Sequence, residues 1–205
     1  MIRILLATAI LLTGSAVVTS EEVPTRASQA REVLRDCEAS GELIGQPDTA
    51  WEGPKSALAE HEALRSVLNE PMPESPTRVL VFASGGHLAT TQFSVVLERE
   101  DDGQWHGTAA GRSRIWVENA PYAPMDRKAW TLSAEKAERL DALLKGRCLY
   151  AEPSQFSSIS SGPPPRGAMA MHLDIVTPEQ RRSAAFLGGE AEGLTAEVMA
   201  LVLPD

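Results

Sequence analysis

The first stretch of the chain whose residue types could do chemistry is Ser84-Gly85-Gly86-His87, which follows the apolar run 79–82. A phosphate-binding loop would lead from a strand into a helix whose N-terminus faces the anion. A nucleophile elbow would need the pattern G-x-S-x-G and a following helix. Here a second strand-like run, 91–98, follows the glycines instead. Because adjacent glycines between two strands supply the positive φ angles of a tight turn, the stretch predicts a β-hairpin turn. A ligand contact made by His87 at its tip is compatible with that turn.

Other candidate catalytic or metal-binding residues are scattered along the chain. The histidines are His61, His87, His106 and His172. Zinc sites usually show paired ligands at short spacing, and neither H-E-x-x-H nor paired cysteines occurs. Ser133 and Lys136 match the S-x-x-K pattern of penicillin-recognising enzymes, but the companion motifs are absent and Ser133 can cap a helix. The sequence therefore predicts no metal site, no cofactor and no catalytic residue.

A recognition surface is predicted on one strand and the segment after it. Arg112, Arg114 and Trp116 alternate along the chain and so share one face of a strand. Tyr122 follows between two prolines. Arginine and aromatic side chains dominate the energetically important positions of protein interfaces, so these four residues, with His87, are the candidate binding residues. The alternative is a solvated face on which the arginines pair with the many acidic residues.

The N-terminus has the layout of a secretory signal peptide, with Arg3, an apolar or weakly polar run over 4–18 and small residues near its end. Cleavage is predicted after Ser20, with Ala16 as the second candidate. The run is shorter than the roughly 20 residues needed to cross a bilayer, and no cysteine follows it for lipid attachment. We therefore expect a periplasmic or secreted protein with no stable membrane anchoring after cleavage.

The charge balance is acidic. The 205 residues include 19 Lys and Arg against 28 Asp and Glu, a net charge of −9. Nucleic-acid binding depends on many cationic contacts with phosphate, so nucleic acid is excluded as a partner. An acidic surface usually serves solubility, and the expected partner is an exported protein or a small ligand.

The cysteine count predicts a single disulfide. Cys37 and Cys148 are the only cysteines in the sequence, and exported compartments are where thiols become disulfides. Cys37 falls on the apolar face of the helix predicted over 25–40, and Cys148 comes just after the helix predicted to end at Gly146, so both are expected to point inward. Two buried free thiols are the alternative.

Hydrophobic periodicity predicts an α+β fold. Helices are expected over 25–40, over 54–69, from the cap residue Ser133 to Gly146, and after a cap at Thr195. Strands are expected at 78–83, 91–98, 113–118, 168–176 and 182–187, with a hairpin turn at Asp101-Asp102-Gly103 and a Ser- and Pro-rich loop at 154–167. The expected architecture is an antiparallel sheet of about five strands with helices packed on one face, preceded by an N-terminal helical pair.

The expected domain organisation is a signal peptide (1–20), an N-terminal helical segment (21–76) and an α+β domain (77–205), the last two forming one compact unit. The length suits a single domain of this kind.

The layout from Val79 onward resembles the small emfourin-type inhibitors that are encoded with protealysin-like metalloproteases. The resemblance is carried by Ser84-Gly85-Gly86 after the first strand, by Leu132, Leu140 and Leu144 in and before the central helix, and by the terminal helix 194–203 after a strand pair. It implies an inhibitor of an extracellular protease and transfers no functional residue.

We therefore expect an exported, non-enzymatic binding or inhibitor-like domain. The alternative is a small periplasmic hydrolase whose groups come together only in the fold. Convergence of His87, His172 and a carboxylate in one cleft would favour the hydrolase.

Overall fold

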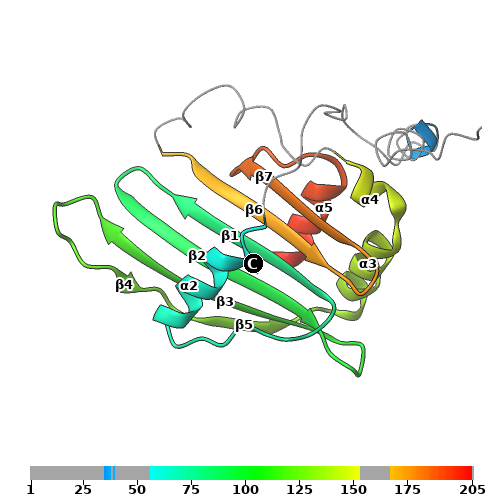
Figure 1. Ribbon diagram of the computed structural model, residues 1–205, viewed down its shortest axis with the longest axis horizontal. Coiled ribbons are helices and arrows are strands. Elements are labelled where there is room, and N and C mark those ends of the chain that lie inside the picture. Colours follow the sequence, from blue (N-terminus) through cyan, green and yellow to red (C-terminus); the bar gives the residue numbers. More distant parts are fainter. Residues whose placement is uncertain (1–34, 38, 40–55, 153–166, 205) are drawn as a thin grey trace, which may run out of the picture.

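A single antiparallel sheet dominates the computed structural model, which describes residues 35–37, 39, 56–152 and 167–204. Its strands are β1 (Arg78–Gly85), β2 (Ala89–Arg99), β3 (Trp105–Ile115), β4 (Ala123–Pro124), β5 (Lys128–Thr131), β6 (Met169–Val176) and β7 (Arg181–Leu187). The spatial order is β4-β3-β2-β1-β6-β7, and β5 also pairs with β3 (Figure 1). The signal peptide, nearly all of the predicted helix 25–40 and the loop 154–166 lie outside the described residues.

Helices cover both faces of this sheet. They are α2 (Leu58–Val67), α3 (Ala134–Lys145), α4 (Arg147–Ala151) and α5 (Gly193–Val202). α3 and α5 lie behind the sheet in Figure 1, and α2 crosses the front of β2 and β3. The predicted α+β class is confirmed. The second helix of the predicted N-terminal pair covers the face opposite to α3 and α5. In the described part of the chain, none of the helices is long and apolar enough to cross a bilayer.

The main core lies between the sheet and α3 and α5. Side chains alternate between the two faces of a strand, and β1 turns Val79, Val81 and Ala83 toward these helices. In the register, Val81 lies opposite Val95 of β2 and Leu173 of β6. The helical residues that complete this core are Leu140, Leu143, Leu144, Val198, Met199 and Val202. Packing against α3 and α5 holds β1, β2 and β6 in place. β3 continues the sheet toward the edge that β4 and β5 form.

Two local predictions are confirmed by the strand pairing and the helix cap. β1 and β2 form an antiparallel hairpin, in which Gly85 and Gly86 have φ angles of 153° and 126°. Ser133 caps α3, and its Oγ accepts a hydrogen bond from the backbone N–H of Lys136 at 3.3 Å. Both features follow from local residue preferences, which a short window of sequence contains.

The third strand differs from its prediction. It was expected over 113–118, but β3 begins at Trp105 and ends at Ile115. It contains Gly107 and Gly111, and glycine is depleted in strands. The reason for Gly107 is tertiary, since a Cβ there would lie 2.2 Å from Cε2 of Trp130 in β5. The short strands β4 and β5 were not predicted.

The last helix also starts differently. Thr195 was expected to cap it, but α5 begins at Gly193 and Thr195 lies in its first turn. The cap comes instead from Glu152, which lies just after α4. One carboxylate oxygen of Glu152 accepts the backbone N–H of Leu194 at 2.5 Å and the other accepts that of Thr195 at 2.9 Å. This cap spans more than 40 residues of sequence, which no local pattern can contain.

The predicted disulfide between Cys37 and Cys148 is present, and both half-cystines are buried. Ala151 and Leu194 pack against it. It joins the N-terminal segment to α4, directly beside the N-terminus of α5.

A buried polar cluster attaches α2 to the sheet. Arg65 Nε donates to Ser94 Oγ at 2.8 Å, and its Nη2 donates to the backbone oxygen and the hydroxyl of Thr108 at 3.0 Å each. Ser94 Oγ also lies 2.7 Å from His61 Nδ1. His61, Arg65 and Ser94 are each at most 1% exposed. A cluster of this kind fixes one position of the helix, because every misplacement would leave buried polar groups unpaired.

This cluster keeps His61 neutral. Ser94 Oγ accepts from Arg65 Nε and also hydrogen-bonds His61 Nδ1, with donor and acceptor in the second bond set by the tautomer of the ring. Nε2 is buried without a hydrogen-bond partner among the described residues, and the ring meets Phe82 edge-on. Burial, followed by the positive charge of Arg65 and the proximity of His172, lowers the pKa of His61 from 6.5 to about 3.

Acidification is therefore expected to destabilise the fold through His61. The unfolded chain takes up a proton at His61 below pH 6.5, whereas the folded chain does so only near pH 3, so the stability falls as pH drops below 6.5. The slope for one such group is about 1.4 kcal/mol per pH unit, or about 2 kcal/mol between pH 6.5 and pH 5. Urea unfolding at pH 7, 6 and 5 measures it. His61→Gln, which cannot take up this proton, should lose less stability over that range, and equal losses in both proteins would contradict the assignment.

Candidate functional site

The predicted binding residues of β3 meet at one face of the sheet. Arg112 Nε donates to Gln92 Oε1 at 2.9 Å, and its guanidinium carbon lies 4.2 Å from the ring centre of Tyr122. The guanidinium carbon of Arg114 lies 4.8 Å from the same ring. Tyr122 is brought here because Ala123 and Pro124 pair with Ser113 and Arg112. We call Arg112, Arg114 and Tyr122 the Arg–Tyr stack, in which each cation–π contact contributes about 0.5–1 kcal/mol.

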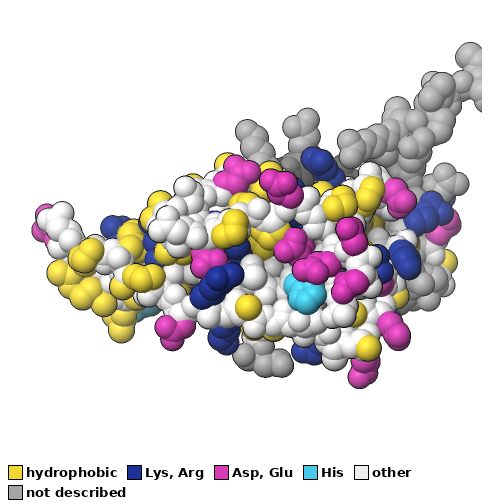
Figure 2. Space-filling view, turned by 90° about the horizontal axis from the view of Figure 1, so that it is seen from below, with side chains coloured by type: hydrophobic (Ala, Val, Ile, Leu, Met, Phe, Trp, Pro, Cys, Tyr) yellow, Lys and Arg dark blue, Asp and Glu magenta, His cyan; other side chains and the backbone are white. Residues whose placement is uncertain are grey.

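Trp116 lies just beyond this stack and is 76% exposed. Its backbone N–H donates to the carbonyl oxygen of Leu88 at 3.1 Å, which places the ends of β2 and β3 together. Three neighbours are equally open to solvent: Leu88 is 77% exposed, Ile115 63% and Val117 62%. We call these four residues the apolar tip. Figure 2 shows hydrophobic side chains gathered at the left-hand end of the molecule, where β3 leads toward β4.

Sequence reasoning found Trp116 but missed the other three residues of the apolar tip. The signal was present, since Ile115, Trp116 and Val117 form a run of three apolar residues where a strand ends and a polar turn is normal. A run of this kind can equally continue a buried strand. The structure shows that the run is exposed, because β3 ends at Ile115 and the chain leaves the sheet there.

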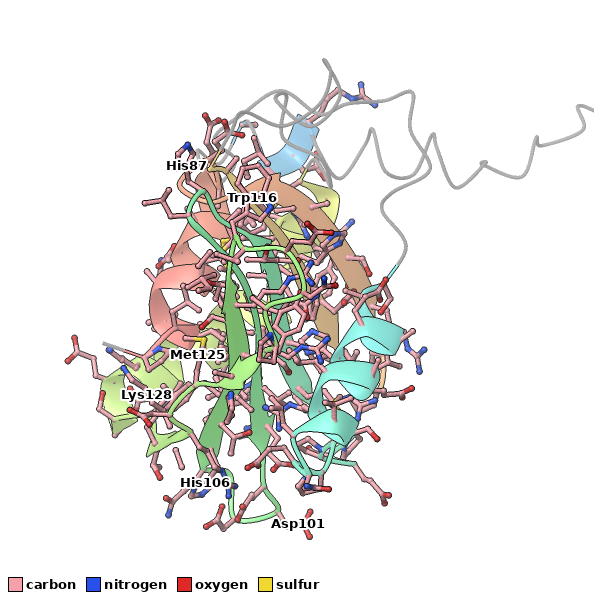
Figure 3. The ribbon with its side chains drawn as sticks, turned by 90° about the vertical axis from the view of Figure 1, so that its left-hand side faces the viewer. His87, Asp101, His106, Trp116, Met125 and Lys128 are labelled. Carbon is pink, nitrogen blue, oxygen red and sulfur yellow. A yellow bond between two sulfur atoms is a disulfide. The ribbon has the colours of Figure 1, made fainter. Side chains whose placement is uncertain are left out.

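His87 lies in the turn between β1 and β2, at the same end of the molecule as Trp116 (Figure 3). It is exposed and lies beside Gly167, where an added Cβ would be 3.2 Å from that of His87. His87 therefore borders the start of β6, whereas the Arg–Tyr stack lies on β3 and β4. The structure brings four of the five predicted binding residues to neighbouring positions and places His87 across the same end of the sheet.

The residues that would favour a hydrolase do not converge. His172 of β6 pairs with Phe82 in the middle of β1, whereas His87 lies beyond the end of β1. Within residues 56–152 and 167–204 and the few described residues before them, no three His, Cys, Asp or Glu side chains gather as metal ligands would.

Comparisons of the chain with protein-family models, with curated proteins and with solved structures give no match.

Proposed function

We propose that the protein is an exported, non-enzymatic domain that binds another exported protein through the apolar tip and the Arg–Tyr stack. Export is supported by the layout of residues 1–20 and by the disulfide between Cys37 and Cys148, which suits an oxidising compartment. The observation that carries the proposal is the exposure of the apolar tip beside two ordered arginines.

The apolar tip supplies the driving force for association. Exposed apolar residues that gather in one patch mark interaction sites, whereas single exposed residues do not. Fully burying one Leu, Ile or Val side chain contributes about 1.5–3 kcal/mol. Because the tip is a projecting end of two strands rather than a hollow, its partner is expected to offer an apolar depression.

The Arg–Tyr stack supplies specificity. Two guanidinium groups are held against one ring, and Arg112 is further fixed by Gln92, so less side-chain entropy is lost on binding. Guanidinium groups suit carboxylates, with which they form paired hydrogen bonds. The expected partner surface therefore combines an apolar depression with an adjacent Asp or Glu. The resemblance to emfourin-type inhibitors supports an exported metalloprotease as the first partner to examine.

The double substitution Arg114→Ala and Trp116→Ala is expected to abolish partner capture. Loss of two central interface residues typically costs at least about 2 kcal/mol, which is about thirtyfold in affinity. The mature protein would be used to capture partners from the exported fraction of its own source, and the affinity for the identified partner would then be measured. Inhibition of a protealysin-like metalloprotease would be assayed in parallel.

A matched control removes the same residue classes elsewhere. Val67 on α2 is 64% exposed and Arg181 on β7 is also exposed, so Val67→Ala with Arg181→Ala should leave capture unchanged. Equal affinity of the wild type and the Arg114 and Trp116 variant for the captured partner would exclude this surface.

A further inference from the structure

The face of β3 opposite to the Arg–Tyr stack carries an apolar groove. Ala109 and Gly111 pair with Val95 and Phe93 of β2, on the face that packs against α3 and α5. Over these small residues lies a groove of about 250 Å³. The side chains that form its apolar wall are Phe93, Val95, Met125, Leu203 and Pro204, and its charged lining residues are Asp126 and Lys128.

Met125 forms the rim of this groove. Its backbone N–H donates to the carbonyl oxygen of Gly111 at 2.8 Å, which holds the segment after β4 against β3. A Cβ at Gly111 would lie 3.1 Å from Sδ of Met125, so the glycine lets the methionine lie close to the strand. Met125 is 44% exposed, and Asp126 beside it is exposed as well. The groove therefore presents an apolar side chain and a carboxylate to solvent.

The dimensions of the groove suit a single large side chain. Ordinary small-molecule sites have volumes of about 300–1,000 Å³, and this groove is smaller. Methionine adapts to apolar groups of irregular shape and makes favourable contacts with aromatic rings. Aromatic rings also pack favourably against one another. A wall that contains both Met125 and Phe93 is therefore suited to an aromatic side chain.

The chain itself carries such a side chain. Trp116 of the apolar tip is 76% exposed, and Arg114 precedes it by two residues. The surface expected above for a partner of the tip combines an apolar depression with an adjacent carboxylate, and the groove with Asp126 has both features. Trp116 does not reach the groove of its own chain, because β3 stays paired with β2 up to Ile115. Figure 3 shows Trp116 and Met125 well separated along the sheet.

We propose that the apolar tip of one copy docks in the groove of a second copy. Trp116 would lie against Met125 and Phe93, and Arg114 would pair with Asp126, since guanidinium groups form paired hydrogen bonds with carboxylates. This inference rests on the proposed function, because it uses the same surface. It adds that self-association covers the apolar tip when the exported partner is absent.

A two-fold axis would make this contact reciprocal. Gly111 and Ile115 are four residues apart on one strand, about 13 Å. An axis that passes between the groove and the tip places each tip at the groove of the other copy. Both tips are then covered and the assembly is closed, and closed two-fold dimers are the commonest homo-oligomers.

The mass of the mature protein in solution tests self-association. Light scattering after size exclusion, from about 1 μM to about 1 mM protein, should show a rise from one chain to two. Trp116→Ala and Met125→Asp should each weaken the association at least about tenfold. Both side chains are exposed, so the fold should be retained, which circular dichroism verifies. Val67→Asp on α2, where Val67 is 64% exposed, is the matched control and should associate like the wild type.

Mixing two variants tests whether the tip meets the groove. The Trp116→Ala chain keeps its groove and the Met125→Asp chain keeps its tip. Immobilised Trp116→Ala chain should therefore capture the Met125→Asp chain, and it should not capture a chain that carries both substitutions. Packing of two tips against each other predicts the opposite, namely no effect of Met125→Asp and no capture by the Trp116→Ala chain, and that result would overturn the proposal.

Charge exchange tests the pairing of Arg114 with Asp126. Arg114→Glu and Asp126→Arg should each weaken self-association about tenfold, because each places like charges at the contact. In a chain with both substitutions opposite charges meet again, so this chain should associate more tightly than either single variant. Additive losses would contradict the assignment of this pair.

Partner capture keeps this test separate from that of the proposed function. Met125→Asp should lose self-association and still capture the exported partner, because the apolar tip and the Arg–Tyr stack are unchanged. A wild-type protein that stays monomeric up to about 1 mM overturns self-association alone. Self-association of a protein that captures no exported partner overturns the protein-partner proposal alone.

Discussion

Replacing Cys37 and Cys148 together by alanine is expected to lower the free energy of unfolding by about 4–5 kcal/mol. The disulfide joins residues 111 positions apart. In the chain-entropy model, the stabilisation grows with the length of the loop that the bond closes in the unfolded chain, so a loop of this length is near the upper end of the usual range. Urea unfolding of the oxidised wild type and of the double variant measures the difference.

Reduction of the wild type provides the control for this result. A reducing agent should bring the wild type to the stability of the double variant and should not affect the variant itself. An alanine variant as stable as the oxidised wild type would show that the bond contributes nothing to the native state. Intact mass before and after alkylation verifies that the wild type starts with the bond formed.

The second large effect is expected from Glu152→Ala, which should lower the free energy of unfolding by about 3–5 kcal/mol. Glu152 and Arg182 form a buried ion pair at 3.6 Å, with side chains 1% and 4% exposed. Burial lowers the pKa of Arg182 to about 10 although the charge of Glu152 raises it, so removing the carboxylate leaves the buried guanidinium without its counter-charge. Leu194 and Thr195 would lose the acceptors of their backbone N–H groups at the same time.

Two further variants separate the contributions of Glu152. Glu152→Gln keeps one acceptor oxygen for the N-terminus of α5 but removes the charge, so it should cause an intermediate loss. Glu192 is an exposed carboxylate at the same helix end and makes no side-chain capping bond. Glu192→Ala should therefore change stability by less than about 0.5 kcal/mol. If Glu152→Ala costs no more than this control, the buried network is not what holds α5 in place.

The elements that the sequence predicted well are those stabilised by neighbours in sequence. The branched and aromatic residues of the run 79–82 predict β1, because such side chains are enriched in strands. Ser133 marks the start of α3, because its side chain reaches a backbone N–H three residues on. The adjacent pair Gly85 and Gly86 predicts the hairpin turn for the same local reason.

β3 is the element for which local preference misled the prediction. Gly107 and Gly111 argue against a strand when taken by themselves. They are nevertheless required, since Trp130 occupies the place of a side chain at Gly107 and a Cβ at Gly111 would lie 2.8 Å from the backbone oxygen of Gln92. The same long-range packing explains β5, because Trp130 packs against Gly107 only once β5 has paired with β3. The reason for a small residue at position 107 is a contact 23 positions away, so no short window of sequence contains it.

By itself the sequence determined the α+β class, the hairpin of β1 and β2, the start of α3 and the pairing of Cys37 with Cys148. Each of these depends on short-range periodicity or, for the disulfide, on there being two cysteines to pair. Only the tertiary structure decided that Glu152 caps α5, that Tyr122 lies against two arginines, and that Ile115, Trp116 and Val117 are exposed. Those features depend on which segments meet across the sheet, and the free energy that brings them together comes from burial of residues far apart in the chain.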